Sequence, residues 1–273
     1  MQVEEVLLYE KVGAVARITM NRPEKRNAQN LRMLQLLSEA VAVAGADHEV
    51  RVIVLSGAGP CFSAGHDLAE NANDPEVSRL RSAVETRTDL ERRLYWQPAI
   101  DLRDVLKPTI AQVHSHCIAA GLMLAAMCDL VVASDDAVFS DPVARMGAAG
   151  VELPVELWAF GAKRAKEILL TGRTVDAETA MAWGFLNRLV SRERLESEVD
   201  ELAASIAAMP PEAVRLTKLS INRSLDIMGM TASFEQHFDI HQVSHATDES
   251  RRLLEERRQA GDVRKYVAKR DAR

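Results

Sequence analysis

The sequence predicts an α/β protein, and three observations support this prediction. Short stretches rich in β-branched residues alternate with amphipathic stretches in the first half of the chain, which is typical of α/β architectures. The second half is mostly helical in pattern. At 273 residues the chain is long enough for one large domain with an ample core. We therefore expect a core over 1–208 and a helical region over 209–273, divided near Met209-Pro210-Pro211.

The expected strands of the first half are bounded by glycine, proline and polar clusters. They span 6–9, 12–20, 50–56, 109–113, 129–133 and 137–139. The first two should flank a turn at Lys11-Val12-Gly13. Residues 114–120 are small or polar and are expected to form another turn, which leads into a helix.

Amphipathic spacing predicts the helices. Leu31, Leu34, Leu37 and Val41 mark the first of them, and the polar stretch 71–97 is expected to form a surface helix with a thin apolar stripe. Asp176 should cap a later helix at its N-terminus, and Gly172 should end the one before it. The remaining expected helices span 98–106, 121–127, 161–170, 176–183, 194–209, 211–224, 231–246 and 248–260.

Composition excludes several classes of protein. A net charge of −6 with no basic stripe argues against a nucleic-acid partner. No apolar run approaches the ~20 residues of a membrane span, and the first residues carry acid where a signal peptide would carry base. We expect a cytoplasmic protein without a membrane partner. Cys61, Cys117 and Cys128 lack metal or disulfide spacing and are expected to be small core residues.

Two turns of small residues follow strands, at Ala64-Gly65-His66-Asp67 and at Ile118-Ala119-Ala120-Gly121. Small residues let a ligand approach the backbone closely. The second turn opens a helix, where free N–H groups favour negative charge. Two such donors that converge would form an oxyanion hole. The alternative is that both turns are small only because they pack tightly.

The order of motifs resembles that of the crotonase (enoyl-CoA hydratase/isomerase) superfamily over nearly the whole chain. The similar segments are Asn21-Arg22-Pro23 with Asn27-Ala28, Phe62 to Leu68, Lys107-Pro108-Thr109-Ile110-Ala111, Leu124-Ala125 with Cys128-Asp129, Ala137 to Pro142, Leu170-Thr171-Gly172, Ala180 with Trp183-Gly184, and Tyr266 to Arg270.

The resemblance implies a fold, a substrate class and a set of site residues. The fold is a crotonase-like spiral of ββα units with a helical C-terminal region that packs homotrimers, commonly paired into hexamers. The substrate is an acyl-CoA thioester, so coenzyme A arrives with the substrate and no cofactor is permanently bound. The backbone N–H groups of His66 and Ala120 match the two oxyanion donors. The coenzyme A site matches Lys25, Arg26, Ala28, Ala64, Asp67, Leu68 and Lys269.

The chain departs from the family at the two positions where a hydratase carries its catalytic glutamates. By alignment these positions hold Met123 and Val143, which cannot transfer a proton and are expected to line the acyl pocket. Glu152 is the candidate replacement. Its neighbours Val151 and Leu153 are apolar, so we expect burial to disfavour its charged form. A salt-bridged or exposed loop glutamate is the alternative.

Histidines supply the remaining candidates. The His66 ring could add a hydrogen bond to a thioester, a carboxylate or a water. One of His114 and His116 could line the acyl pocket, and His116 is kept as a substrate-binding candidate. His237, His241 and His245 share a helical face at a spacing that can bind metal. No neighbouring carboxylate calls for an ion, so we expect no metal.

These observations leave three functions open. The first is an acyl-CoA enzyme of the hydratase/isomerase family, a lyase or isomerase of fatty-acid or related metabolism, that uses Glu152 in place of the usual glutamate pair. The second is an acyl-CoA-binding protein without turnover. The third is a decarboxylase or isomerase of the same family, in which the oxyanion hole does most of the catalysis.

Overall fold

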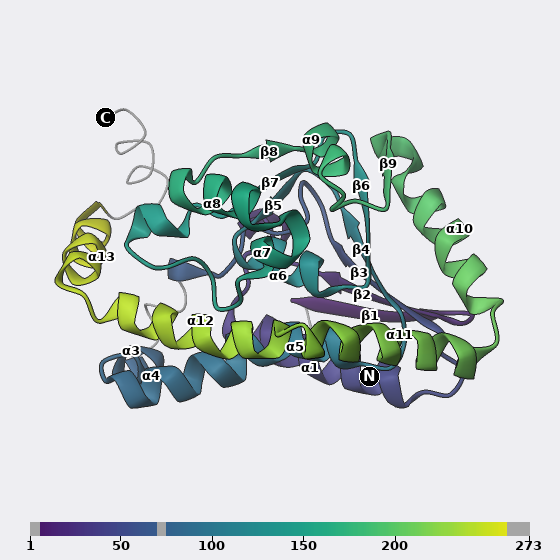
Figure 1. Cartoon of the computed structure of the whole chain (residues 1–273), viewed down its shortest axis with the longest axis horizontal. Helices are drawn as coiled ribbons and strands as arrows, with labels where there is room; N and C mark the ends of the chain where they lie inside the picture. Colours follow the sequence, from purple (N-terminus) through teal and green to yellow (C-terminus); the bar gives the residue numbers. More distant parts are fainter. Residues whose placement is uncertain (1–5, 70–74, 261–273) are drawn as a thin grey trace.

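A six-stranded sheet runs through the centre of the protein, in the strand order β1-β2-β3-β4-β6-β9 (Figure 1). The structure is a computed structural model that describes residues 6–69 and 75–260. The strands are β1 Leu7–Val12, β2 Val15–Met20, β3 Val52–Gly57, β4 Thr109–Val113, β6 Leu130–Ser134 and β9 Arg188–Val190. The β1–β2 pair is antiparallel and the other pairs are parallel.

Both faces of this sheet are covered, which explains why β3 is apolar at successive positions. Ile53 and Leu55 join the main core, whereas Val52 and Val54 face the second core cluster. Helix α10 (Leu195–Ala207) covers that second face. The main core lies on the other side, where α1 (Leu31–Ala46), α5 (Gln97–Asp104) and α6 (Ala120–Met127) contribute buried side chains.

A second sheet of three short strands continues the main core. Its strands are β5 His116–Ile118, β7 Val138–Ser140 and β8 Val175–Asp176, in that order. The other helices are α3 Pro75–Leu80, α4 Val84–Glu91, α7 Val155–Phe160, α8 Ala162–Thr171, α9 Ala177–Ala182, α11 Pro211–Ile227, α12 Met230–His245 and α13 Asp248–Ala260. Single turns are η1 Pro23–Lys25, η3 Val143–Met146 and η4 Arg192–Arg194, and a π-helical turn spans Arg92–Trp96.

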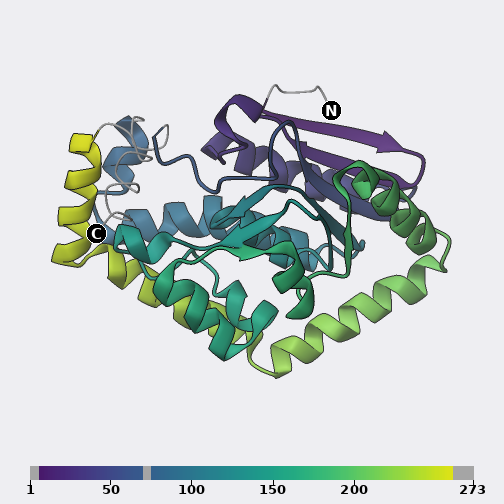
Figure 2. The same cartoon turned by 90° about the horizontal axis from the view of Figure 1, so that it is seen from above.

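Most of residues 211–260 form helices, as the sequence predicts for this region. Helices α11 and α12 run along one edge of the molecule, with α12 beside α4 and α13 at the end (Figures 1 and 2). Phe234 and Phe238 of α12 are buried in the main core, and Arg87 of α4 is hydrogen-bonded to Gln242 of α12. The α/β class is therefore confirmed, while the division of the chain at residue 208 stays a prediction. None of the helices in the described ranges is long and apolar enough to cross a membrane.

Several local predictions are confirmed. Asp176 accepts a hydrogen bond from Thr179 N at the start of α9, and Gly172 ends α8 in the left-handed conformation. Cys61, Cys117 and Cys128 are buried free thiols.

Other local predictions are wrong. The first hairpin turns at residues 13–14 and not at Lys11-Val12-Gly13, because Val12 still pairs with Val15. The turn expected over 114–120 contains β5. The surface helix expected over 71–97 is α3, α4 and the π-helical turn, with residues 71–74 outside the described part. Its segments bury Val77, Leu90, Leu94 and Tyr95 in a small core cluster of their own, so it is more than a surface helix.

Candidate active site

The turn that carries His66 follows β3 and is held by the loop before α1. Asn27 donates a hydrogen bond from Nδ2 to the Cys61 carbonyl at 2.8 Å. The Ser63 hydroxyl donates to the Asn27 carbonyl at 2.9 Å and accepts from Gly65 N at 3.2 Å. These bonds explain why polar residues of the first loop accompany the later glycine turn in the sequence.

The second turn lies directly against the first. Ser63 N donates to the His116 carbonyl and Ile118 N donates to the Ser63 carbonyl, both at 3.0 Å. A Cβ added at Gly121 would lie 2.7 Å from Ser63 O, and one added at Gly65 would lie 3.3 Å from Ala120 N. Glycine is therefore needed at both positions for the turns to meet.

The two meeting turns each carry an unused donor. Within the described ranges, the N–H groups of His66 and Ala120 donate no hydrogen bond, although their neighbours Gly65 and Asp67 do. Ala120 is the first residue of α6, where free N–H groups favour an anion. Ala119 before it has φ 50° and ψ −117°, a conformation that favours glycine. Strain of this kind clusters at functional sites.

A cavity of about 200 Å³ opens beside His66. Leu68, Val143, Val151 and Glu152 line it, together with residues of α4, α12 and α13. The lining mixes apolar side chains with ionisable ones. This is the usual composition of a site that binds a small molecule and acts on it.

Glu152 and His66 form a buried pair in the cavity wall. His66 Nε2 lies 3.1 Å from Glu152 Oε2, and the His66 ring stacks on Tyr95 with centroids 4.0 Å apart. Only 5% of the Glu152 side chain is exposed. His66 Nδ1 is buried and has no partner in the described part of the chain. A buried polar atom of this kind needs a partner, such as a bound molecule or water.

The charge on Glu152 differs from our expectation. Burial does act to raise the pKa of this carboxyl, as the apolar neighbours predict. The adjacent His66 and His241 rings outweigh burial and lower the pKa to about 2. The prediction that desolvation disfavours the charged form is therefore wrong in its net direction, because apolar flanking residues do not reveal the partners that the fold supplies.

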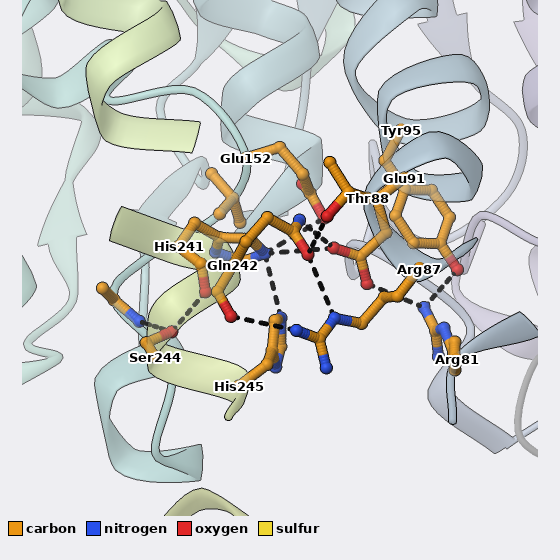
Figure 3. Close-up of polar contacts among 12 residues, drawn as sticks. Arg81, Arg87, Thr88, Glu91, Tyr95, Glu152, His241, Gln242, Ser244 and His245 are labelled. Carbon is orange, nitrogen blue, oxygen red and sulfur yellow. Dashed lines mark hydrogen bonds and ion pairs between the residues drawn. The ribbon is translucent and has the colours of Figure 1, made fainter. Parts of the chain in front are cut away.

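A cluster of histidines and a second carboxylate adjoins this pair (Figure 3). His241 Nε2 lies 3.0 Å from His245 Nε2, 3.6 Å from Glu91 Oε2 and 3.9 Å from Glu152 Oε1. Burial opposes the charged form of His241, but Glu91 and Glu152 raise its pKa. Burial and the His241 ring lower the pKa of His245 to about 4. The expectation that no neighbouring carboxylate calls for an ion is wrong, because Glu91 and Glu152 both approach His241. His237 is not part of this cluster and bonds Val151 O at 2.8 Å.

A second pair of buried acids lies behind the cavity wall. Asp141 accepts hydrogen bonds from Val143 N and Val151 N, and burial raises its pKa to about 6. Burial and the nearby Asp141 raise the pKa of Glu156 well above its usual value. Glu156 Oε1 has no partner within the described ranges. In the folded protein both carboxyls therefore keep their protons to a higher pH than usual.

Glu156→Gln is therefore expected to stabilise the protein at alkaline pH. Because both pKa values are raised on folding, the native state holds protons that the unfolded chain releases. The contribution of these two carboxyls to stability is therefore fully present below about pH 4 and is lost as the pH rises. Glutamine resembles the protonated carboxyl at every pH, so folding no longer requires position 156 to take up a proton. The free energy of unfolding in urea should rise by about 1 to 3 kcal/mol at pH 8 and change little at pH 4. Glu178→Gln, on the exposed side of α9, is the control. An unchanged pH slope for Glu156→Gln would contradict this account.

The structure places the other predicted residues in three groups. Lys25, Arg26 and Ala64 are exposed side by side, because Ala64 N donates to the Arg26 carbonyl at 3.0 Å. Asp67 is buried and bonds Arg22 Nη1 at 2.8 Å; the same nitrogen donates to Ala28 O at 2.6 Å. Asp67 thus supports the first loop from inside.

The remaining candidates lie apart from the cavity. Met123 is fully buried in the main core and His116 is exposed on β5, and neither lines the cavity. His114 is buried against the Gly59 carbonyl at 3.0 Å. Lys269 lies outside the described residues.

Comparisons with known proteins show which family the chain belongs to. A family model described as enoyl-CoA hydratase/isomerase matches residues 10–271. The chain belongs to the enoyl-CoA hydratase/isomerase family. The Mycobacterium tuberculosis protein EchA13, named as a candidate enoyl-CoA hydratase, is 42% identical over 258 residues, which cover 89% of this chain and 81% of that protein.

Solved structures of this family confirm the crotonase-like fold. An enoyl-CoA hydratase/isomerase from Xanthobacter autotrophicus Py2 superposes with a TM-score of 0.92 at 34% identity, covering 99% of this chain and 98% of the other. A candidate enoyl-CoA hydratase from Mycobacterium smegmatis gives a TM-score of 0.82 at 44% identity, with 88% and 94% covered. The resemblance read from the motifs is confirmed.

Sequence reasoning missed the part of the site that comes from α4 and the following turn. Glu91, Tyr95 and Arg87 line the cavity, yet they stand in a polar stretch whose weak apolar pattern predicts only a surface helix. One signal was present in the sequence. Tyr95-Trp96 is a pair of large aromatic residues in a charged segment, and large aromatic side chains are seldom left exposed.

Proposed function

We propose that the protein is an acyl-CoA enzyme that stabilises a thioester enolate with the backbone N–H groups of His66 and Ala120. One observation supports this most strongly: two turns meet with one unused N–H each, and His66 of the first turn lines a cavity that holds a buried acid–base pair. Preorganised donors of this kind contribute roughly 3 to 4 kcal/mol each to lowering a barrier. Membership of the enoyl-CoA hydratase/isomerase family agrees with a thioester substrate.

The proton-transfer group in this proposal is the Glu152–His66 pair. The carboxylate accepts from His66 Nε2 and so fixes the orientation of the ring. His66 Nδ1 is then the atom that meets a substrate proton or a water. Because Met123 and Val143 occupy the usual glutamate positions, the chemistry differs from two-glutamate hydration.

Coenzyme A belongs to the substrate in this proposal, and no permanently bound cofactor is needed. Lys25 and Arg26 are exposed beside Ala64, where cations would meet the nucleotide phosphates. Leu68 and Val143 would contact the acyl group in the cavity.

A second candidate is favoured by the cations in the cavity wall. Arg81, Arg87 and Arg251 line the cavity, and arginine is suited to bind a carboxylate. A carboxylated acyl-CoA would fit such a wall. Decarboxylation of that substrate would need the oxyanion hole and no proton abstraction.

One substrate panel tests these proposals. The full chain is incubated with crotonyl-CoA, longer 2-enoyl-CoAs, 3-enoyl-CoAs and carboxylated acyl-CoAs, and the products are identified by mass. Gain of water identifies a hydratase, an isomeric product an isomerase, and loss of carbon dioxide a decarboxylase. Tight binding without conversion of any substrate would contradict the enzyme proposal and leave an acyl-CoA-binding protein.

We also propose that the protein is a homotrimer or a pair of trimers. Helices α11 and α12 expose large apolar side chains, among them Leu216, Ile221, Ile240 and Val243. Such surfaces mark protein contacts. Light scattering should give a mass about three or six times that of the 30.1 kDa chain. A monomeric mass would contradict this proposal.

A further inference from the structure

Three potential metal ligands meet on the cavity wall, from two helices that pack side by side (Figure 3). His241 and His245 lie one turn apart on α12, with their Nε2 atoms 3.0 Å from each other. Glu91, the last residue of α4, places Oε2 3.6 Å from His241 Nε2. The ligand atoms of all three residues lie within 4.8 Å of one another.

The two separations that involve His241 suit a single small cation. Zinc binds imidazole nitrogen and carboxylate oxygen at about 2.0 to 2.2 Å, so ligands at tetrahedral angles lie roughly 3.3 Å apart. The distances of 3.0 and 3.6 Å fall on either side of that value. Two facing imidazole nitrogens need a proton or a cation between them.

The surrounding hydrogen bonds orient the ligands as they do in metal sites. His241 uses Nδ1 to bond the Gly150 carbonyl at 3.0 Å, which directs Nε2 toward Glu91 and His245. Gln242 donates to Glu91 Oε2 at 2.7 Å. Arg87 holds Gln242 through its side-chain and main-chain oxygens, both at 3.0 Å.

The nearby carboxylates and the exposure of the cluster to the cavity also suit a cation. Glu91 and Glu152 bring two carboxylates to within 4 Å of His241 Nε2. Arg81 approaches the other oxygen of Glu91 at 3.8 Å, and Arg87, which also lines the cavity, is hydrogen-bonded to Gln242. Glu91, His241 and His245 all line the cavity. A bound ion would therefore have one coordination position facing the space beside His66.

We propose that Glu91, His241 and His245 form a binding site for Zn²⁺ or a divalent cation of similar ligand preference. Two imidazoles and one carboxylate with a free fourth position are the ligand set of catalytic zinc sites. Calcium and magnesium prefer sites of oxygen alone. The proposal concerns metal binding by these residues and does not depend on the acyl-CoA chemistry.

Metal retention by the chelator-treated full chain tests this proposal. After equilibrium dialysis against Zn²⁺, elemental analysis should find about one zinc per chain. His245→Ala and Glu91→Gln should each weaken binding at least tenfold, and Gln242→Leu should weaken it about 10- to 100-fold. His237→Ala is the matched control, because His237 lies on the same helix but bonds Val151 O. It should bind like the wild type.

Cobalt spectroscopy keeps the test decisive if a variant fails to fold. Co²⁺ bound to the wild type should show the intense visible bands of four- or five-coordinate cobalt. Weak octahedral bands, or no zinc retained by the wild type, would overturn the proposal, and the His241–His245 contact would then share a proton. Unchanged binding by folded His245→Ala and Glu91→Gln would overturn it as well.

Discussion

Glu152→Gln is expected to lower the turnover of the best acyl-CoA substrate by a factor of about 10² to 10⁴. Glutamine keeps the size of the side chain and can still contact His66. It carries no negative charge, so it no longer fixes the imidazole through a carboxylate or supports a transferred proton. The loss should fall on kcat with little change in KM, because Glu152 is proposed to act on the proton and not to bind the thioester.

Glu156→Gln provides the matched control for this measurement. Glu156 is as buried as Glu152, with 1% and 4% exposed, and lies four residues away, but it does not line the cavity. Its replacement should leave turnover within about threefold of the wild type. Equal turnover by Glu152→Gln and the wild type would remove Glu152 from the mechanism.

Gly65→Ala is expected to lower turnover by a factor of about 10² to 10³, the effect of losing one oxyanion donor. The added Cβ would lie 3.0 Å from Ile118 O and 3.3 Å from Ala120 N, so the second turn must move away from the first. Acyl-CoA affinity should change less than kcat, because the donors are proposed to act most strongly on the enolate.

The backbone cost of this substitution can be separated from its effect on the site. Gly65 has φ +85°, and Gly184 has φ +84° with no atom within 4 Å of an added Cβ. Gly184→Ala should therefore lose similar stability, roughly 1 to 2 kcal/mol, but keep its activity. Similar losses of activity in both variants would show that Gly65 matters only for folding.

Local sequence patterns predicted the elements that have a clear hydrophobic periodicity or a continuous buried run. β4 has the predicted bounds, Thr109–Val113. A stretch rich in β-branched residues between Lys107-Pro108 and a polar segment determines where this strand begins and ends. Strands β8 and β9 are two and three residues long. Such strands are stabilised by their neighbours in the sheet and carry no periodic signal of their own.

The two turns of small residues could be predicted from the sequence because each is local, while their role as oxyanion donors stays a prediction. Each is a short run of small residues after a strand, and the structure brings Gly65 and Gly121 against the opposite turn. The ionisable side chains that α4 and α12 contribute to the cavity wall could not be predicted in the same way. Glu91 and Gln242 are 151 residues apart in the chain and meet only because α4 packs beside α12.

The charge of Glu152 also depends on residues that are distant in the sequence but adjacent in the fold. Val151 and Leu153 correctly indicate that Glu152 is buried, and burial alone would raise its pKa. His66 and His241 approach from distant segments and lower the pKa to about 2. The sequence around an ionisable group therefore predicts its burial better than its charge.

A crystal structure of the full chain with a bound acyl-CoA or a non-reactive analogue tests the central claim most directly. The thioester oxygen should lie roughly 2.7 to 3.1 Å from both His66 N and Ala120 N, with the acyl group in the cavity beside Glu152. A thioester oxygen beyond about 3.5 Å from these nitrogens, or one held by other donors, would contradict the account.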